Sequence, residues 1–177
     1  IFVSKNFKFG KKRLGNIKTL KDFEKKYSYT SVVTTPHKKR DKVVSSSLIR
    51  KIINKGRVQD AEKLLGRPWC VEGEVIKGAQ RGRKIGFPTC NIRLNPYTLP
   101  KLGVYSVLVQ IENQKKRGIA NIGYRPTFNG KTLLLEVNIF GINRNLYKKI
   151  LKISFIKFIR AEKKFKNISR LKSQIKK

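Results

Sequence analysis

Between about Val71 and Ile159, short runs of Val, Ile, Leu, Phe and Tyr alternate with positions rich in Gly, Pro and Asn. This pattern is typical of several short antiparallel strands, which usually close into a barrel or a sandwich. The polar segment 112–116 joins two of the runs and predicts a hairpin turn. The predicted strands cover residues 70–78, 90–94, 103–112, 117–122, 133–139 and 148–160.

The residues before this region predict two short helices. The hydroxyls of 45–47 can cap a helix whose apolar face is Leu48, Ile49, Ile52 and Ile53, and Gly56 should end it. A second helix is predicted over 59–65, with Gly66 as its stop. Residues 1–44 are rich in lysine and weakly periodic, and we interpret them as loops around pieces of strand.

The end of the chain predicts a third helix. After Phe165, apolar residues recur at Ile168, Leu171 and Ile175, which is the spacing of one helix face. We expect this terminal helix to pack on the barrel.

Length and composition fit a globular protein of 177 residues, of which 39% are hydrophobic. Lys or Glu interrupts every apolar run before the roughly 20 residues that a membrane span needs, so we expect no transmembrane helix. The first residues show neither an initiator Met nor a secretory signal, so we expect a truncated start and a cytoplasmic location. Cys70 and Cys90 lack a CxxC partner, and we interpret them as small apolar residues rather than zinc or disulfide ligands.

The charge is strongly positive, with 43 Lys and Arg against 10 Asp and Glu and a formal net charge of +33. Such a field attracts nucleic acid, acidic lipid or phosphorylated ligands. The lysines are spread over the whole length, and the aromatic residues lie mostly within apolar runs. We therefore favour a solvated lysine-rich surface over a nucleic-acid-binding groove.

The segment 78–91 is the strongest candidate for chemistry, because it combines glycines with basic residues between two predicted strands. Free N–H groups in such a loop can bind an anion, and Arg81, Arg83 and Lys84 add positive charge. Taken alone, a loop of this kind is more often an ordinary turn. It differs from the GxxxxGK[ST] phosphate loop and opens no long helix.

Residues 86–91, Gly-Phe-Pro-Thr-Cys-Asn, resemble the GFPTAN signature of riboflavin kinases. The order and spacing of further segments are similar to the kinase module of bacterial bifunctional riboflavin kinase and FAD synthetase proteins. The resemblance covers residues 66–177 and implies a Greek-key antiparallel β-barrel with a C-terminal helix, preceded by a fragment of an α/β nucleotidyltransferase domain. The further segments are 65–68, 103–105, 120–123, 125–128, 135–137, 145–147 and 158–160, with Glu162 and Phe165.

The resemblance also implies a reaction, transfer of the ATP γ-phosphate to the 5′-hydroxyl of riboflavin to give FMN. Thr89 and Asn91 would hold Mg²⁺ and the ATP phosphates, since Mg²⁺ prefers hard oxygen ligands and shares substrate phosphates. Without the resemblance, both would be ordinary turn residues. The residues implied on the ATP phosphate side are Gly78, Arg81, Gly82, Lys84, Gly86, Thr89 and Asn91.

Glu136 is the implied general base, which would take the proton of the attacking hydroxyl. It lies in an apolar run, where alternation leaves its face open and a salt bridge to a lysine is the alternative. We expect Glu136 and the turn 82–91 to converge across a barrel mouth. Arg160, Glu162 and Phe165 match a segment beside the flavin ring, with ion pairing next to a helix as the alternative.

Residues 1–65 resemble the end of the family's FMN adenylyltransferase domain, and 66–177 its kinase domain. The adenylyltransferase also needs a His-bearing motif upstream of Ile1, so we expect FMN but not FAD as product. Two alternatives stay open: a basic nucleic-acid-binding barrel and an inactive flavin-binding remnant. The sequence does not indicate an oligomeric state.

Four positions depart from the family pattern. Cys90 replaces the signature Ala, which is a change between small residues. Asn138 replaces a frequent His, residues 141–145 replace a more acidic loop, and Lys148 replaces a usual Gly. We expect these changes to affect flavin affinity more than phosphate transfer.

Overall fold

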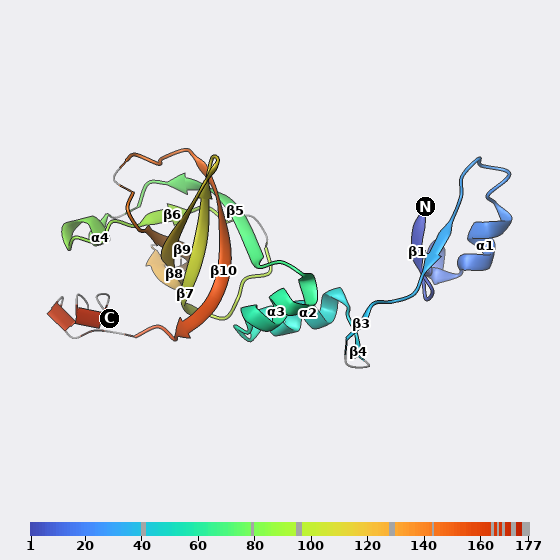
Figure 1. The fold of residues 1–177 in the computed structure, drawn as a ribbon, viewed down its shortest axis with the longest axis horizontal. Coiled ribbons are helices and arrows are strands. Elements are labelled where there is room, and N and C mark those ends of the chain that lie inside the picture. The colour runs from blue at the N-terminus through green and yellow to red at the C-terminus, as the bar shows by residue number, and fades with distance from the viewer. Residues whose placement is uncertain are drawn as a thin grey trace. The chain divides into compact units, whose positions relative to one another are not determined.

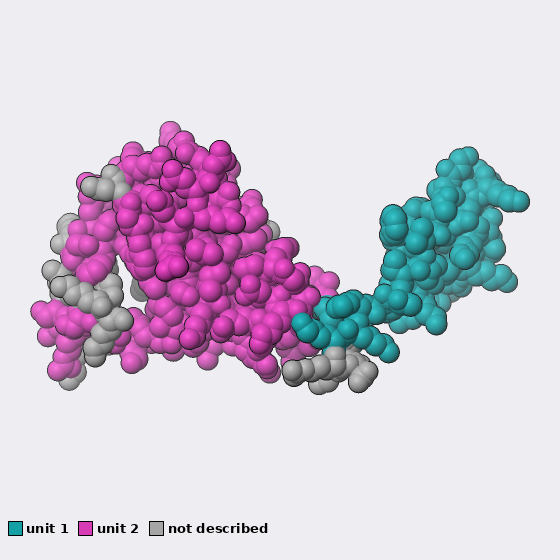
Figure 2. Space-filling model, in the orientation of Figure 1, with its two compact units in different colours: residues 1–45 teal, residues 46–177 magenta. Residues whose placement is uncertain are grey.

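The computed structural model describes the backbone except at 40–41, 79, 95–96, 128–129, 143, 164, 166, 168, 171–172 and 175–177. The side chains of 42, 81, 84, 125–127 and 130–132 also lie outside the description. The chain forms two compact units, Ile1–Ser45 and Ser46–Lys177, which Figure 2 colours separately.

The first unit contains a helix that the sequence analysis missed. Strand β1 (Phe2–Ser4) pairs in parallel with β2 (Val32–Thr34), η1 (Lys11–Arg13) is a 3-10 turn, and β3 (Lys38–Lys39) pairs with β4 (Lys42–Val43). The missed helix is α1 (Ile17–Asp22). The Asn16 side chain accepts a hydrogen bond from the Thr19 backbone N–H at 3.2 Å, which is an N-cap, and Leu20 is buried.

In the second unit, α2 (Ser46–Asn54) and α3 (Val58–Leu65) form where the sequence predicts them. Gly66 ends α3 in the left-handed region at φ 72°, and its N–H donates to Glu62 O at 2.8 Å. Helix α3 contacts two strands of the barrel, β5 and β10, and its Val58 and Ala61 are buried. The domain boundary expected at residue 65 stays a prediction, because these helices belong to the same compact unit as the barrel.

The barrel confirms the predicted mainly-β fold. Its closed order is β10-β5-β6-β9-β8-β7, so β10 returns beside β7 after the consecutive strands β7, β8 and β9 (Figure 1). This order is a Greek key. The strands are β5 (Trp69–Ile76), β6 (Cys90–Ile92), β7 (Gly103–Ile111), β8 (Gln114–Thr127), β9 (Gly130–Ile139) and β10 (Ile150–Arg160), and α4 (Arg81–Lys84) lies between β5 and β6.

Alternation along the strands separates an apolar inside from a more polar outside. In β7, every second residue from Gly103 to Ile111 is buried. Tyr105 and Phe155 are fully buried and meet edge to face, with ring centroids 5.3 Å apart. Burial raises the pKa of Tyr105 to about 12, and its hydroxyl donates to Lys101 O at 2.5 Å. The barrel interior is therefore a filled core.

Two predicted boundaries are corrected by pairing between strands. The β7–β8 turn consists of Glu112 and Asn113 alone, because Ile111 pairs with Gln114 and the polar residues that follow are strand. Strand β8 extends to Thr127 and strand β9 begins at Gly130, since each strand supplies the other's backbone hydrogen-bond partners.

Of the predicted terminal helix, the apolar residues Ile168, Leu171 and Ile175 lie outside the described residues. Among the described helices, none has the length and apolar character of a membrane span.

Candidate active site

Three polar side chains form a row on the outer face of adjacent strands. Glu136 of β9 lies directly opposite Asn91 of β6 on one side and Asn121 of β8 on the other. Its neighbours Leu135 and Val137 point to the core and are fully buried. Because directly opposed residues share a sheet face with Cβ atoms about 4.5–5.5 Å apart, the Glu136 carboxylate and both amides are close neighbours.

Asn91 is a buried polar residue with an unsatisfied oxygen. It is 6% exposed, and its Oδ1 has no hydrogen-bond partner within the described part of the chain. Its amide nitrogen lies against Gly78, where a Cβ atom would come within 1.7 Å of Nδ2. Gly78 therefore permits the loop after β5 to close over Asn91. An orphaned carbonyl oxygen of this kind costs roughly 1–3 kcal/mol, and a cation or donor would satisfy it.

The turn after β5 folds back on itself beside Thr89. Phe87 N donates to Gly82 O at 2.9 Å, and a Cβ atom on Gly82 would lie 2.4 Å from Phe87 O and 3.2 Å from Thr89 Oγ1. Gly86 holds a left-handed φ of 89° that completes the reversal. The predicted phosphate ligands Arg81 and Lys84 belong to α4, and their side chains lie outside the described residues.

Thr89 lines a cavity of about 420 Å³ at one end of the barrel. Core residues Val75 and Ile139 form part of its wall, and Gln80 spans it by donating to the Tyr147 hydroxyl at 3.1 Å. The remaining lining residues are Arg83, Pro88, Cys90, Ile142, Arg144, Asn145 and Leu146. A cavity with a mixed wall and basic side chains suits a phosphorylated ligand.

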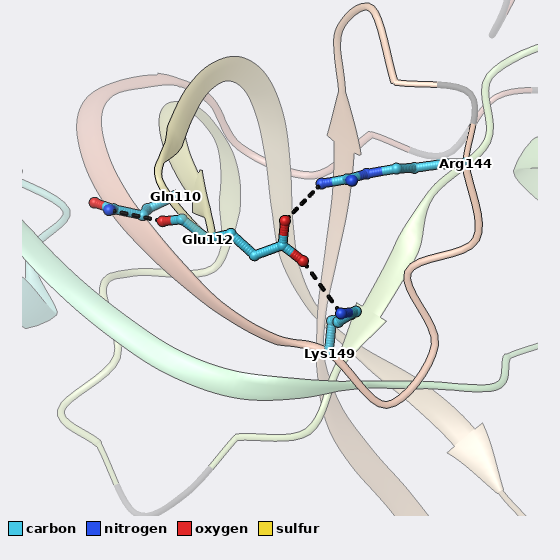
Figure 3. Close-up of polar contacts among 4 residues, drawn as sticks. All are labelled: Gln110, Glu112, Arg144 and Lys149. Atoms are coloured by element: carbon cyan, nitrogen blue, oxygen red, sulfur yellow. Dashed lines mark hydrogen bonds and ion pairs between the residues drawn. The ribbon is translucent and has the colours of Figure 1, made fainter.

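Figure 3 shows an ion-pair cluster that holds the loop forming one side of this cavity. The Glu112 carboxylate accepts from Lys149 Nζ at 3.1 Å and from Arg144 Nη2 at 3.5 Å. The bond from Lys149 and the charges of Lys149 and Arg144 lower the pKa of Glu112. Glu112 thus ties the β7–β8 turn to the segment between β9 and β10.

Glu162 reaches the same row from the C-terminal side. Asn121 Nδ2 donates to Glu162 Oε1 at 3.2 Å, and a Cβ atom on Gly123 would lie 2.0 Å from that oxygen. Gly123 therefore leaves the space that Glu162 fills beside β8. The Arg160 guanidinium lies 5.7 Å from the centroid of the Phe165 ring, and its Nη1 donates to Ala161 O at 3.1 Å. The three predicted flavin-side residues thus lie at the end of β10, where Arg160 is the last residue, and in the segment after it, which holds Glu162 and Phe165.

The arrangement differs in one respect from the expected convergence across a barrel mouth. Asn91 and Glu136 lie side by side on the outer wall of the barrel, because they occupy paired positions of adjacent strands. Thr89 lines the cavity at the barrel end. The site therefore runs over the rim, from the cavity to the outer face.

Sequence reasoning gave no role to Asn121 or Gly123, although both belong to a segment that carries the family resemblance. The signal available was the polar Asn between Ala120 and Ile122, which are both fully buried. Asn138 also has a clear place, since its Nδ2 donates to Pro88 O at 2.6 Å and supports the turn before Thr89. Burial raises the pKa of the Cys90 thiol, which keeps it protonated and unreactive.

Comparison with known proteins assigns the family. The riboflavin kinase family model, Flavokinase, matches residues 65–177. The chain belongs to the riboflavin kinase family. Within it, a Bacillus subtilis bifunctional riboflavin kinase/FMN adenylyltransferase is 41% identical over 97% of this chain and 55% of its own length. The Haemophilus influenzae protein of the same name is 39% identical over 99% of this chain and 57% of its own length.

A solved structure shares the fold. A crystal structure described as a macrolide-efflux protein from Streptococcus pneumoniae is 34% identical, with a TM-score of 0.83 over 98% of this chain and 56% of that chain. The chain spans about half the length of the curated relatives it matches. The likeness covers the riboflavin kinase module and residues that precede it.

Proposed function

We propose that the chain transfers the γ-phosphate of ATP to the 5′-hydroxyl of riboflavin and releases FMN and ADP. The observation that carries the proposal is the row in which Glu136 lies directly opposite Asn91, next to the turn that holds Thr89. This arrangement puts a carboxylate beside oxygen ligands suited to a metal-bound phosphate.

The phosphate donor belongs on the side of the β5–β6 turn. The cavity lined by Thr89, Arg83 and Tyr147 has room for a nucleotide, and its rim lies beside the backbone turn at Gly82. Thr89 Oγ1 and the unsatisfied Asn91 Oδ1 are hard oxygen donors and fit Mg²⁺. Among the described residues, no cluster of three His, Cys, Asp or Glu offers an alternative metal site. Bound Mg²⁺ would supply positive charge that stabilises the transferring phosphate.

Glu136 acts as the general base. Its carboxylate takes the proton of the riboflavin 5′-hydroxyl as that oxygen forms a bond to the γ-phosphorus and the bond to the β-phosphate oxygen breaks. ADP leaves with the bridging oxygen. Alignment of hydroxyl, phosphorus and leaving oxygen is the main contribution of the surrounding residues.

The flavin belongs on the C-terminal side. Arg160 ends β10, and Glu162 and Phe165 follow it. Glu162 accepts a hydrogen bond from Asn121, which lies in the same row as Glu136. The planar guanidinium and the aromatic ring offer stacking surfaces for an isoalloxazine ring. A cytoplasmic location and a lack of adenylyltransferase activity stay predictions.

The direct experiment is incubation of the purified chain with riboflavin, ATP and Mg²⁺, followed by chromatographic separation of flavins. FMN should accumulate with one ADP for each FMN, and FAD should be absent. Riboflavin binding without turnover would identify an inactive flavin-binding remnant. Salt-sensitive binding of single-stranded nucleic acid, with no binding of riboflavin, would instead support the nucleic-acid-binding alternative.

A further inference from the structure

Asn121 holds a second unsatisfied polar atom in the row that contains Glu136. It lies directly opposite Glu136 on the neighbouring strand, and its Oδ1 is shielded from solvent with no hydrogen-bond partner in the described part of the molecule. Buried polar atoms are almost always paired, so each exception calls for an explanation. Asn91 Oδ1, a further unsatisfied atom among the described residues, lies on the opposite side of Glu136.

The orientation of the Asn121 amide is fixed by its partner. Asn121 Nδ2 donates to Glu162 Oε1 at 3.2 Å, and an ionised carboxylate only accepts hydrogen bonds. Reversing the amide would bring its oxygen against the carboxylate and remove that bond. The other polar atom of the amide, Oδ1, is therefore a hydrogen-bond acceptor for which no described residue supplies the donor.

The local packing shows that this position is built for polar contact. Ala120 and Ile122 on either side of Asn121 are fully buried in the core. Gly123 leaves room for Glu162, because a Cβ atom there would lie 2.0 Å from Glu162 Oε1. A carboxylate and an amide are thus held together on the outer face of β8, beside the position from which Glu136 acts.

We propose that Asn121 is a further substrate-binding residue, whose Oδ1 accepts a hydrogen bond from a secondary hydroxyl of the polyol chain of the acceptor substrate. This inference rests on the proposed function and names the contact that would align the polyol with Glu136. A polyol carries donors on adjacent carbons, so one can meet Asn121 Oδ1 while the terminal hydroxyl meets the Glu136 carboxylate.

The test couples a variant to substrate analogues. Riboflavin and its 2′-, 3′- and 4′-deoxy analogues are assayed with the whole chain and with Asn121→Leu, which has a similar size and no polar atoms. The variant should lower kcat/KM for riboflavin about tenfold, the scale of one buried hydrogen bond. With the unaltered chain, one deoxy analogue should also have a kcat/KM about tenfold below that of riboflavin. For that analogue, Asn121→Leu should lower kcat/KM almost no further, because the hydrogen bond is already missing.

Two further variants separate binding from structure. Asn121→Asp keeps an acceptor but gives up the bond to Glu162, so it should still discriminate between riboflavin and that analogue. Gln114→Leu makes a similar amide-to-leucine change at the exposed start of β8, about 20 Å along the strand from Asn121. It should leave the ratio of kcat/KM between riboflavin and each deoxy analogue unchanged. Circular dichroism and thermal unfolding establish that each variant is folded.

The outcomes distinguish this inference from the proposed function. An active chain in which Asn121→Leu loses the same factor with riboflavin and all three analogues would overturn the role of Asn121 and leave the kinase intact. If the unaltered chain makes no FMN, the proposed function fails. In that case, quenching of flavin fluorescence measures the affinity of the unaltered chain and of Asn121→Leu for riboflavin and its three deoxy analogues without ATP. An equal loss of affinity for all four flavins in the variant would again contradict the inference.

Discussion

The two faces of strand β9 differ in what their side chains do. On the inner face, Leu135 and Val137 are fully buried in the core. On the outer face, Glu136 lies between two asparagines, and Asn138 donates to Pro88 O at 2.6 Å. Neighbouring residues of one strand thus form the core of the barrel on one side and the proposed catalytic row on the other.

The difference between the two faces indicates how a small barrel can hold a polar site and a fully apolar core on the same strand. A carboxylate placed inside would need pairing to offset a desolvation cost of several kcal/mol. On the outer face, Glu136 is only partly buried, which suits its proposed role as general base, while Leu135 and Val137 of the same strand pack in the core. Changes on the two faces should therefore separate activity from stability.

The largest expected effect on activity comes from Glu136→Gln. The amide keeps the size of the side chain but does not accept the proton, so kcat should fall by about a hundredfold to ten-thousandfold. FMN formation at saturating substrates measures this loss, and circular dichroism establishes that the variant is folded. An unchanged kcat would remove Glu136 from the role of base.

Leu135→Ala tests the other face of the same strand. Truncating a fully buried leucine should reduce the free energy of unfolding by about 2–5 kcal/mol. Urea denaturation followed by tryptophan fluorescence measures the loss, since Trp69 packs against the core. At a temperature where the variant is folded, kcat should be close to that of the unaltered chain. A stable variant with low kcat would contradict the division between the faces.

Gly78→Ala tests the contact that covers Asn91. The added methyl would meet Asn91 Nδ2 at 1.7 Å, so the amide or the loop must move. We expect kcat/KM for Mg-ATP to fall about tenfold to a hundredfold, because small misplacements of positioning groups are costly. Gly66→Ala is the matched control: it places alanine at a left-handed φ of 72° with no atom within 4 Å and should affect stability only. Equal kinetics for both variants would argue against the role of Gly78.

Strand β7 and helices α2 and α3 could be predicted from the sequence by physical rules. The apolar run 103–112 predicted β7, the hydroxyl residues 45–47 marked the start of α2, and Gly66 marked the end of α3. The start of β8 could not be predicted, because its polar residues from Gln114 are strand only through pairing with β7. Helix α1 depends on the cap at Asn16 within a lysine-rich segment whose periodicity is weak.

The candidate site could be predicted only through the family resemblance. Nothing in the run around Glu136 indicates which face it takes, because an apolar run without clear alternation fits either. The placement of Asn121 and Glu162 depends on the return of the chain after β10 to the outer face of β8. Such contacts between distant segments have no local pattern in the sequence.

The smallest expected effect separates the row around Glu136 from the exposed ion-pair cluster at Glu112. Glu112→Gln removes the partner of Arg144 and Lys149, and KM for ATP should rise only about twofold, because all three side chains are more than half exposed. The difference in KM from the unaltered chain should shrink at 1 M salt, where screening acts over about 3 Å.

The same substitution tests the pH dependence of stability. Since the pKa of Glu112 is lowered in the folded chain, its contribution to the free energy of unfolding is present above the unfolded pKa and is lost as pH falls through the folded value. Thermal unfolding of the two chains should thus converge in acid below the usual carboxyl range, and a difference that persists there would contradict the ionic origin of the effect.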